Sequence, residues 1–256
     1  MRYGLIGEKL GHSYSKIIHE MLADYTYDLI PLSKEAFPNF MEKKDFTAIN
    51  VTIPYKQAVI PYLDELHPLA EKIGAVNTIV HKDGRYTGYN TDFYGFKYLL
   101  EHNKIDIENK KCLILGSGGT SHTVQAVLEH LGASKILIIS RKDTEYSVSY
   151  ENCYKNHTDA QVIVNTTPLG MYPNVESSPL DLSTFLSCEA VIDAIFNPLE
   201  TRLIKQAHEL GKIGITGLEM LVAQAKQAIE YFMDQELSDE LIEETHRKLL
   251  AIIKDQ

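Results

Sequence analysis

Two residues of opposite charge, Lys56 and Asp92, could together move a proton. Lys56 closes the segment 50–56 (Asn-Val-Thr-Ile-Pro-Tyr-Lys), and Asp92 closes the segment 88–92 (Gly-Tyr-Asn-Thr-Asp). A lysine beside an aspartate can pass a proton to or from an alcohol, while the carboxylate orients and stabilises the ammonium. Both segments follow β-rich runs, and ligands of open α/β sheets bind just outside the carboxyl ends of strands. Taken alone, Lys56 would be an ordinary surface lysine.

A pair of hydroxyls, Ser13 and Ser15, lies between the first expected strand and its helix. Either serine could simply cap that helix, which is a frequent structural use of serine. Two hydroxyls beside the N–H groups of a helix N-terminus would also suit a carboxylate ligand. The sequence leaves both interpretations open.

A glycine-rich turn, Gly116-Ser117-Gly118-Gly119, separates an apolar strand at 111–115 from a helix that continues to about residue 131. Glycines let the backbone approach a pyrophosphate closely, and the helix N-terminus supplies N–H groups and the positive end of the helix dipole. The pattern could also be a tight strand-to-helix turn. Its position between a strand and a helix favours a dinucleotide site.

The next strand ends in Ser140-Arg141-Lys142, and this segment bears on the choice of dinucleotide. A NAD site usually places an acidic residue about 20 residues beyond the glycines, where it accepts from the ribose 2′-hydroxyl. An arginine and a lysine with a hydroxyl would instead hold a 2′-phosphate through charge-assisted hydrogen bonds. Two solvated cations at a strand end are also common, but the glycine turn ahead of them favours NADP.

The elements that must position these residues alternate between short β-rich runs and helical patterns, which predicts an α/β architecture with a parallel sheet. Strands are expected at 2–6, 47–53, 77–81, 85–89, 111–115, 135–139, 161–165, 190–194 and 212–215, with a hairpin turn at Asp83-Gly84. Helices are expected at 15–23, 60–73, 92–102, from the glycine turn to 131, and at 200–210, 218–233 and 239–253. Residues 103–111 are polar, as a linker tends to be, and we expect the crossover at 143–160 to be abbreviated or irregular.

Composition limits the class of protein. The chain has 256 residues, of which 44% are hydrophobic, and this excludes a disordered chain. Its formal net charge of −10 makes general nucleic-acid binding unfavourable. Its apolar runs are shorter than the roughly 18 residues that span a bilayer, and the early charges at the N-terminus do not fit a signal peptide. Three separated cysteines and histidines without ligand spacing predict reduced thiols in a cytoplasmic protein and no metal site.

Taken together, these segments show that the chain resembles the shikimate/quinate dehydrogenase family, and within it the shikimate dehydrogenases. The matching pieces follow one another along nearly the whole chain. They are Gly7 with residues 12–15 (His-Ser-Tyr-Ser), residues 50–56, residues 74–78 (Gly-Ala-Val-Asn-Thr), residues 88–92, residues 116–119, residues 165–171 (Asn-Thr-Thr-Pro-Leu-Gly-Met), Asp193 with residues 197–201 (Asn-Pro-Leu-Glu-Thr), and residues 217–224 (Gly-Leu-Glu-Met-Leu-Val-Ala-Gln). Individually some of these pieces are weak, but their number and order are improbable by chance.

The resemblance implies an oxidoreductase acting on a CH–OH group: the reversible, NADPH-dependent reduction of 3-dehydroshikimate to shikimate in the chorismate pathway of aromatic amino-acid biosynthesis. It also implies a two-domain α/β fold. Residues 1–101 and 218–256 would form the substrate-binding domain, residues 102–217 a Rossmann-like NADP-binding domain, and the C-terminal helices would return to the first domain. The partner would be a small-molecule substrate, and the sequence leaves open whether the protein is a monomer or a homodimer.

The resemblance further implies a role for each matching residue. Lys56 would be the general acid/base, paired with Asp92. The substrate carboxylate would be held by Ser13 and Ser15, and its ring hydroxyls by Thr52, Asn77, Asp92 and Gln224, with Phe196 also at the substrate. NADP would be held by Gly116, Ser117, Gly118, Gly119 and Thr120 at the pyrophosphate, by Ser140, Arg141 and Lys142 at the 2′-phosphate, and by Ala194 and Gly217 at the nicotinamide.

Three positions depart from the family's usual pattern. Lys16 stands where many members have proline, and Phe196 stands where an aromatic hydroxyl is expected, so that one hydrogen bond to the substrate would be lost. The usual Asn-Arg-Thr is Ser140-Arg141-Lys142 here. These departures leave open a quinate/shikimate dehydrogenase paralogue with relaxed or NAD cofactor use. A catalytically silent dinucleotide-binding regulator is a further alternative, but a regulator needs neither Lys56 nor Asp92.

Overall fold

The chain divides into two compact units, one made of residues 1–95 and 221–256 and the other of residues 96–220. The computed structural model describes residues 2–11 and 13–255. The divisions lie inside two helices, α4 (Asp92–His102) and α8 (Leu218–Met233), whereas the sequence placed the domain boundaries near the ends of these helices, at 101/102 and 217/218. None of the helices in the described ranges is both long and apolar enough to cross a membrane.

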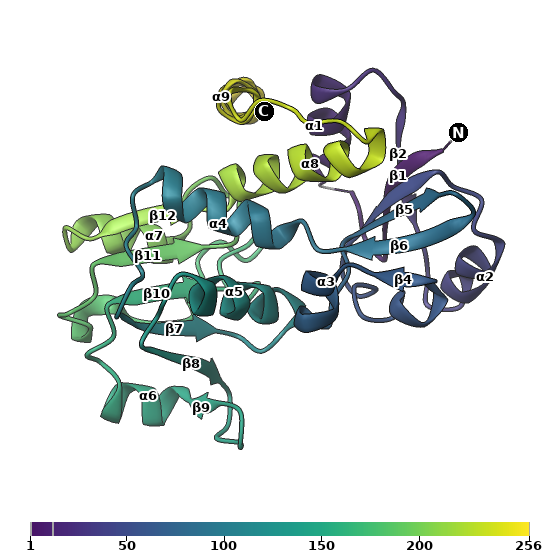
Figure 1. Ribbon diagram of the computed structural model, residues 1–256. Coiled ribbons are helices and arrows are strands. Elements are labelled where there is room, and N and C mark those ends of the chain that lie inside the picture. Colours follow the sequence, from purple (N-terminus) through teal and green to yellow (C-terminus); the bar gives the residue numbers. More distant parts are fainter. Residues whose placement is uncertain (1, 12, 256) are drawn as a thin grey trace. The chain divides into compact units, whose positions relative to one another are not determined.

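The first unit is built on a six-stranded mixed sheet with the strand order β2-β1-β3-β5-β6-β4 (Figure 1). Its strands are β1 (Tyr3–Gly7), β2 (Tyr27–Pro31), β3 (Ala48–Val51), β4 (Glu65–Leu66), β5 (Thr78–Lys82) and β6 (Arg85–Tyr89). Its helices are α1 (Ser15–Leu22), α2 (Ala36–Lys43), α3 (Pro68–Ile73), the end of α8, and α9 (Glu240–Lys254). β1 pairs in parallel with β2 and β3, while β5 is antiparallel to both β3 and β6.

This register places several chain segments at one edge of the sheet. β1 and β3 are parallel and in register, so their carboxyl ends, Gly7 and Val51, leave the sheet at the same edge. β5 runs the other way and starts there with Thr78, which lies opposite Asn50 of β3 and Tyr89 of β6. The expected hairpin between β5 and β6 is confirmed, because Asp83 and Gly84 both adopt the positive φ that a tight two-residue turn requires.

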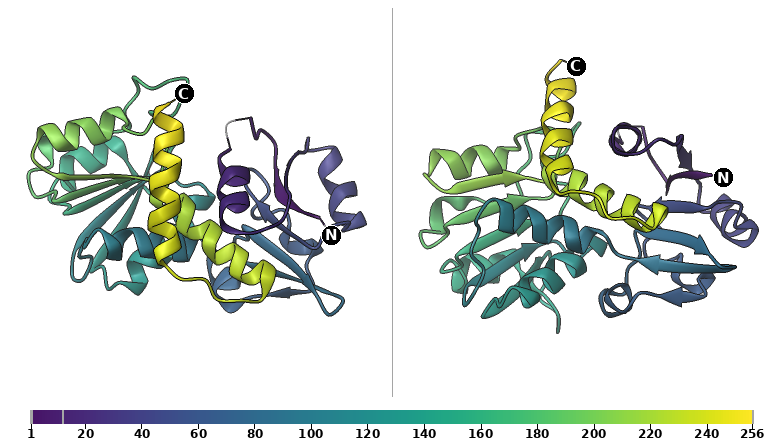
Figure 2. Two further views of the ribbon diagram at one scale, coloured as in Figure 1. Left: turned by 90° about the horizontal axis from the view of Figure 1, so that it is seen from above. Right: turned by 45° about the horizontal axis from the view of Figure 1, so that its top comes forward.

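Successive residues of the central strands pack on opposite faces of this sheet, as the two-residue period of a strand requires. On one face, residues of β1 and β3 such as Ile6 and Ile49 join Phe37 and Met41 of α2. On the other face, Leu5 and Ala48 join Ala228 and Phe232 of α8. The last two helices, α8 and α9, are inclined to each other on either side of the turn near residues 234–239 (Figure 2).

Two parts of this unit differ from the sequence-based expectation. The strand β2 and the helix α2 were not expected. The helix expected at 60–73 is instead a single 3-10 turn (Ile60–Tyr62), the short strand β4 and the two-turn helix α3. The cause lies in the pairing of β4: Asp64 and His67 donate their backbone N–H groups to Tyr86 and Gly88 of β6, and Gly88 lacks the Cβ that would collide with Leu63.

The second unit has a fully parallel sheet with the order β12-β11-β10-β7-β8-β9. Its strands are β7 (Lys111–Leu115), β8 (Lys135–Ser140), β9 (Val148–Ser149), β10 (Val162–Asn165), β11 (Ala190–Asp193) and β12 (Ile213–Thr216), and its helices are α5 (Gly119–His130), α6 (Tyr150–Asn156), α7 (Arg202–Glu209) and the 3-10 turn η2 (Leu182–Thr184). This is the strand order of a doubly wound dinucleotide-binding sheet, whose winding reverses between β7 and β10. The expected parallel α/β architecture is confirmed in this unit.

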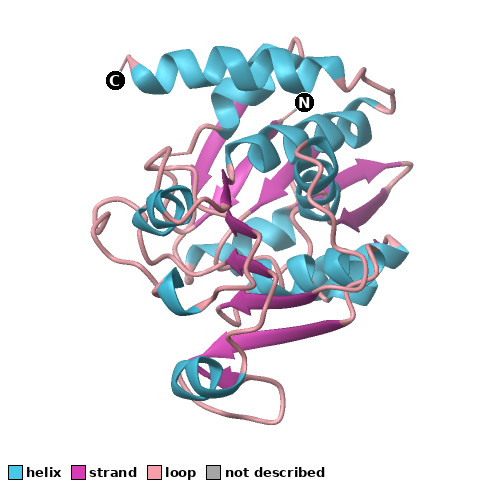
Figure 3. Ribbon diagram, turned by 90° about the vertical axis from the view of Figure 1, so that its left-hand side faces the viewer, coloured by secondary structure: helices cyan, strands magenta, loops and turns pink. Residues whose placement is uncertain are grey.

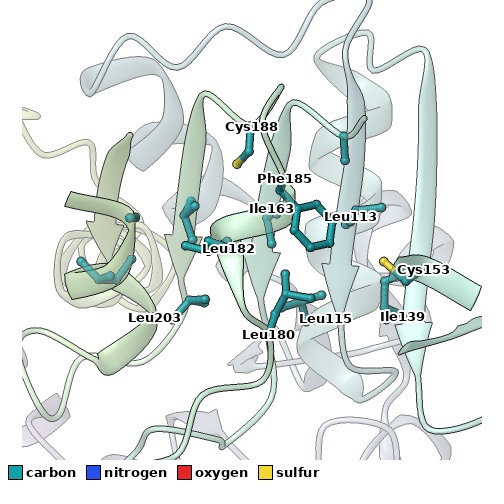
Figure 4. Packing of buried hydrophobic residues seen from close by; sticks show 14 residues of the cluster. Leu113, Leu115, Ile139, Cys153, Ile163, Leu180, Leu182, Phe185, Cys188 and Leu203 are labelled. Atoms are coloured by element: carbon teal, nitrogen blue, oxygen red, sulfur yellow. The ribbon is translucent and has the colours of Figure 1, made fainter. Parts of the chain in front are cut away.

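Both faces of this second sheet are covered, which explains its nearly continuous apolar strands. Leu113, Leu115 and Ile163 point to one face, where they pack against Phe185 beside η2 and against Leu203 of α7 (Figure 4). The expected abbreviated crossover is confirmed, because only the seven-residue helix α6 follows β9, at the bottom of Figures 1 and 3.

The cysteines, Cys112, Cys153 and Cys188, are free and buried in this unit. Burial raises the pKa of each thiol, to about 12 for Cys112 and about 11 for the other two, so they are protonated at neutral pH. Within residues 2–11 and 13–255, histidines, cysteines and carboxylates nowhere form a group of three or more that could hold a metal ion.

Candidate functional site

The structure brings Lys56 and Asp92 together in the first unit. The Lys56 Nζ lies 2.6 Å from Asp92 Oδ2, and the two side chains are only 15% and 12% exposed. Lys56 is held on both sides: the Tyr55 hydroxyl donates to the carbonyl of Leu32 (2.7 Å), and the Lys56 carbonyl accepts from the N–H of Val76 (2.8 Å). The ammonium retains further N–H groups for a ligand after it has donated to Asp92.

Asp92 occupies the first position of α4, where a negative charge is favoured by the helix dipole. The turn leading into α4 is fixed by Asn90, whose side-chain amide donates to the carbonyl of Ala75 (2.9 Å) and accepts from the N–H of Phe93 (3.2 Å). The carboxylate is therefore placed by the backbone, and it in turn orients the ammonium.

Asn77 and Gln224 lie in the same connected group, joined by Thr91. Asn77 Oδ1 accepts from the Thr91 N–H (2.7 Å), and Thr91 Oγ1 donates to Gln224 Oε1 (3.3 Å). All three side chains are buried, although Gln224 lies more than 130 residues away in the chain. Helix α8 thus contributes a side chain to the turn between β6 and α4, within the first unit.

Three further predicted residues, Ser13, Ser15 and Thr52, follow β1 and β3 at the same sheet edge. Ser15 is buried at the first position of α1, and its N–H donates to Ser13 Oγ (3.3 Å). Ser13 thus accepts from the first N–H of the helix, although the N-cap residue is Tyr14 and α1 has no side-chain capping hydrogen bond. His12, which belongs to the same sequence segment, lies outside the described residues. Thr52 packs its methyl group against Gly7, where a Cβ would lie 2.6 Å from it.

The glycine turn lies at the reversal point of the second sheet, between the carboxyl end of β7 and the start of α5. Gly116 has a φ of +100°, and a Cβ there would lie 2.9 Å from the Thr167 methyl group, so only glycine fits. By contrast, a Cβ on Gly118 or Gly119 would meet no atom within 4 Å, which leaves open space above the first turn of α5. The N–H groups of Gly119 and Thr120 have no preceding helical carbonyl to bond. Open glycines over unpaired helix N–H groups fit a pyrophosphate.

Arg141 and Lys142 are exposed on the loop between β8 and β9. The loop is closed at its base by the Ser140 hydroxyl, which donates to the carbonyl of Lys142 and lies 2.9 Å from Ser147 Oγ. Across the described part of the chain, neither cation forms an ion pair with a carboxylate. Two uncompensated cations on a closed loop fit a 2′-phosphate.

The nearest acidic residue of this loop, Asp143, is turned toward α6. Its carboxylate accepts from the N–H and the hydroxyl of Ser149 (2.9 and 2.8 Å) and from the amide of Asn152 (3.0 Å). These hydrogen bonds hold the pKa of Asp143 below its usual value. The Asp143 carboxylate is therefore held by Ser149 and Asn152 and forms no ion pair with Arg141 or Lys142, which are predicted to bind the 2′-phosphate.

Ala194 and Gly217 meet at the carboxyl ends of β11 and β12. A Cβ on Gly217 would lie 2.3 Å from the Ala194 carbonyl oxygen, and the Gly217 N–H donates to the carbonyl of Ile195 (3.0 Å). Phe196, half-buried, follows at the same strand end. It lies in the second unit, whereas the other predicted substrate residues all lie in the first.

The sequence interpretation did not single out four polar residues that the structure connects to this group: Tyr27, Asn50, Thr78 and Thr91. Three of them stand inside the motifs quoted above, so position within a motif was the available signal. Tyr27 lies on the unexpected strand β2, and no sequence signal pointed to it.

Comparison with known proteins identifies relatives along the whole chain. Residues 5–79 match the family model of the shikimate dehydrogenase substrate binding domain. A shikimate dehydrogenase (NADP(+)) of Clostridium beijerinckii is 39% identical over 254 residues, which cover 93% of this chain and 94% of the relative.

Solved structures agree over a similar extent. A chorismate mutase/shikimate 5-dehydrogenase fusion protein from Clostridium acetobutylicum is 35% identical, with a TM-score of 0.91 and 98% of each chain covered. A shikimate 5-dehydrogenase of Thermus thermophilus in complex with NADP(H) and shikimate is 27% identical, with a TM-score of 0.86, covering 97% of this chain and 99% of that one.

Proposed function

The chain belongs to the shikimate dehydrogenase family, and on that premise we propose that it catalyses the reversible reduction of 3-dehydroshikimate to shikimate with NADPH. The observation that carries the proposal is the partly buried pair of Lys56 and Asp92, with Nζ and Oδ2 2.6 Å apart. A binding protein without turnover would need neither a proton donor nor a partner that orients it.

In the proposed reaction, bound NADPH supplies the hydride that adds to the ketone carbon. Lys56 gives a proton to the ketone oxygen as negative charge develops there, and Asp92 keeps the ammonium pointed at that oxygen. In the reverse direction, neutral Lys56 accepts the proton of the alcohol. The protein's part is therefore to position the substrate and to hold one proton at Lys56 Nζ.

The substrate is an anionic ring with several hydroxyls, and the proposed ligands match that chemistry. Ser13 and Ser15 bind its carboxylate beside the N-terminus of α1. Thr52, Asn77 and Asp92 bind its hydroxyls from one edge of the sheet and Gln224 binds them from α8, while Phe196 takes the place of a hydrogen-bonding residue. A site with this many polar partners strongly rejects an analogue that lacks one hydroxyl, because a buried partner would be left unpaired.

We assign the cofactor to the second unit. Gly116, Ser117, Gly118, Gly119 and Thr120 hold the pyrophosphate, Ser140, Arg141 and Lys142 hold the 2′-phosphate, and Ala194 and Gly217 contact the nicotinamide. The open glycines at the start of α5 and the two cations without carboxylate partners support this assignment. The buried, reduced thiols support a cytoplasmic location, and the net charge of −10 supports a small-molecule rather than a nucleic-acid partner.

The experiment that tests this function compares kcat/KM for shikimate and quinate, each with NADP+ and with NAD+. The proposal predicts that shikimate with NADP+ gives the highest value. A higher value for quinate or for NAD+ would instead support a quinate/shikimate paralogue with relaxed cofactor use. Binding of shikimate by calorimetry, with no turnover of any pair, would support the silent regulator.

A further inference from the structure

A chain of buried hydrogen bonds runs through the first unit behind the proposed substrate residues. Each of its members is at most 8% exposed, so water does not compete for these bonds. In order, the members are Tyr27, Asn50, Thr78, Asn77, Thr91 and Gln224. The chain starts on the edge strand β2, on the far side of β1, and ends on α8.

The orientations of the two asparagine amides in this chain can be assigned from backbone groups. Asn77 Oδ1 faces the Thr91 N–H (2.7 Å), which can only donate, so the amide oxygen of Asn77 is the acceptor there. Asn50 Nδ2 faces the Asn77 carbonyl (3.3 Å), which can only accept, so the amide nitrogen of Asn50 is the donor. Both amide orientations follow without reference to any ligand.

Each bond that remains joins two side chains, and the hydroxyl protons of Thr78 and Thr91 each have more than one acceptor within reach. One arrangement leaves no acceptor of the chain without a donor. Tyr27 donates to Asn50 Oδ1 (2.6 Å), and the phenol stays a donor because burial raises the pKa of Tyr27 well above its usual value. Asn50 Nδ2 donates to Thr78 Oγ1 (3.0 Å), which donates to Asn77 Oδ1 (3.0 Å).

That oxygen of Asn77 has then accepted two hydrogen bonds, which fills its two lone pairs. The Thr91 hydroxyl accepts from Asn77 Nδ2 (3.0 Å), and its own proton has Asn77 Oδ1 (3.2 Å), Thr78 Oγ1 (3.3 Å) and Gln224 Oε1 (3.3 Å) within reach. Because the two other oxygens already accept from Thr78 and Asn50, we assign this proton to Gln224. Every donor in the chain therefore points from Tyr27 toward Gln224.

This direction decides what the two amides present to a ligand. The oxygens of Asn77 and Gln224 are both used inside the protein. Each nitrogen has one of its two N–H groups used, by Thr91 and by the carbonyl of Leu221 (2.8 Å), and retains one. Both residues can therefore act toward a ligand as donors only, and they select oxygen atoms that accept.

We propose that the Tyr27–Asn50–Thr78 hydrogen bonds fill the second lone pair of Asn77 Oδ1, leave the Thr91 proton for Gln224, and thereby hold Asn77 and Gln224 as donors to the ring hydroxyl oxygens of the substrate. Tyr27, Asn50 and Thr78 are positioning residues, since they act through Asn77. The inference rests on the proposed function for the identity of the ligand, but the hydrogen-bond direction itself does not.

Loss of the Tyr27 hydroxyl leaves Asn50 Oδ1 buried without a donor. Asn50 is then held through its Nδ2 alone, so Thr78 is held less firmly, and the Thr78 hydroxyl can donate to Thr91 Oγ1 (3.3 Å) instead of to Asn77. The Thr91 proton can then move to Asn77 Oδ1 (3.2 Å) and leave Gln224 Oε1 without its donor. One lost hydroxyl on β2 would thus loosen two substrate residues on other elements.

The first test uses Tyr27→Phe with Tyr86→Phe as a matched control. Tyr86 also donates its hydroxyl inside the first unit, but to the backbone carbonyl of Lys44 (2.6 Å), away from the chain of bonds. We expect Tyr27→Phe to raise KM for shikimate about tenfold, the equivalent of one lost hydrogen bond, with KM for NADP+ unchanged. Tyr86→Phe should leave both constants unchanged. Equal shikimate constants in the two variants would overturn the proposal.

The second test uses conservative rescue at Thr78. Thr78→Ser keeps the hydroxyl and should keep KM for shikimate within about twofold, whereas Thr78→Val removes it and should behave like Tyr27→Phe. A shikimate analogue lacking one ring hydroxyl adds a readout that a general loss of stability does not move. Wild type should discriminate against the analogue more strongly than Thr78→Val does, because the donors of the variant are already held less firmly. The same discrimination in both proteins would contradict the proposal.

A third readout separates failure of this inference from failure of the proposed function. The side-chain amide signals of Asn77 and Gln224 in ¹H–¹⁵N NMR spectra should shift in Tyr27→Phe and remain in place in Tyr86→Phe. A wild-type protein that does not turn over shikimate refutes the proposed function, and these signals then decide the hydrogen-bond direction alone. Unchanged signals in Tyr27→Phe refute the inference whether or not the enzyme is active.

Discussion

Asp193 gives the protein a pH dependence of stability that can be worked out from its surroundings. The carboxylate is buried at the end of β11 and accepts three hydrogen bonds, from the Thr201 hydroxyl (2.7 Å), the Asn165 amide (3.0 Å) and the Ile195 N–H (3.1 Å). Burial outweighs these bonds and raises the pKa of Asp193 from 3.8 to about 6. Because one pKa unit corresponds to about 1.4 kcal/mol, the ionised carboxylate lowers the free energy of unfolding by about 3 kcal/mol at pH 7.

The sign is opposite to that of an ordinary paired aspartate. Below about pH 4, Asp193 is protonated in both the folded and the unfolded protein, and it contributes no pH dependence. Between about pH 4 and pH 6 the unfolded chain loses the proton first, so the contribution of this group to stability falls as the pH rises. Above about pH 6 both states are ionised and the full penalty remains.

The perturbation is Asp193→Asn, which keeps the shape of the side chain and removes its ionisation. The asparagine oxygen can still accept from Asn165 and Ile195, but the Thr201 hydroxyl loses its acceptor, at a pH-independent cost of about 1 kcal/mol. We therefore expect the variant to be about 1 kcal/mol less stable than wild type at pH 3 and about 2 kcal/mol more stable at pH 7.

Urea unfolding followed by far-ultraviolet circular dichroism at several pH values measures this difference, and ¹³C NMR of the Asp193 carboxyl measures the titration directly. Asp181→Asn in the same unit is the matched control, because hydrogen bonds from Ser183 and Gln206 lower the pKa of Asp181. Its stability relative to wild type should fall, not rise, as the pH increases. A pH-independent difference for Asp193→Asn, or a titration midpoint near 4, would refute the reasoning from burial.

Four substitutions test the proposed site. Lys56→Met should lower kcat by at least about 100-fold, because the proton donor is lost, while calorimetry should show little change in shikimate affinity. Arg141→Ala should raise KM for NADP+ about tenfold or more through the loss of a charge-assisted hydrogen bond, and leave KM for NAD+ unchanged. Asp143→Ala releases the bonds to Ser149, so that the cations are held less firmly, and should raise KM for NADP+ without changing KM for shikimate. Phe196→Tyr restores the hydroxyl usual in the family and should lower KM for shikimate.

Each of these expectations has a contradicting result. Full activity of Lys56→Met would show that Lys56 does not transfer the proton. An equal loss of NADP+ and NAD+ affinity in Arg141→Ala would show that Arg141 does not recognise the 2′-phosphate. An unchanged KM for NADP+ in Asp143→Ala would mean that its hydrogen bonds serve the fold alone. An unchanged KM for shikimate in Phe196→Tyr would place that ring away from the substrate.

Much of the second unit could be predicted from the sequence because its signals are local. The strand 111–115, the glycine turn and the following helix occur where expected, since an apolar run, glycines and a helical pattern are all visible within 20 residues. The hairpin at Asp83-Gly84 is equally local. The prediction of one helix at 60–73 was wrong, because part of this segment forms β4 and pairs with β6, which is distant in the sequence.

The strand β2 and the helix α2 also escaped prediction. β2 is a five-residue edge strand that contains Asp28 and ends at Pro31, and α2 carries Pro38 near its start. The β2 segment has no strong alternation of its own, whereas Phe37, Phe40 and Met41 of α2 do follow a helical spacing that the sequence interpretation missed.

The site likewise contains residues that local motifs indicate and residues that only long-range strand pairing brings in. Lys56 and Asp92 could be paired from their motifs and from the rule that ligands bind at strand ends. The Tyr27 hydroxyl reaches Asn50 only because β1 pairs in parallel with both β2 and β3. No local sequence pattern indicates this pairing.

The most direct test of the central claim is the absorbance of NADPH after purified protein is mixed with shikimate and NADP+. The proposed function predicts a rise that depends on both compounds, that is lost in Lys56→Met, and that reverses when 3-dehydroshikimate and NADPH are supplied instead. No rise, under conditions in which a known shikimate dehydrogenase gives one, would contradict the account.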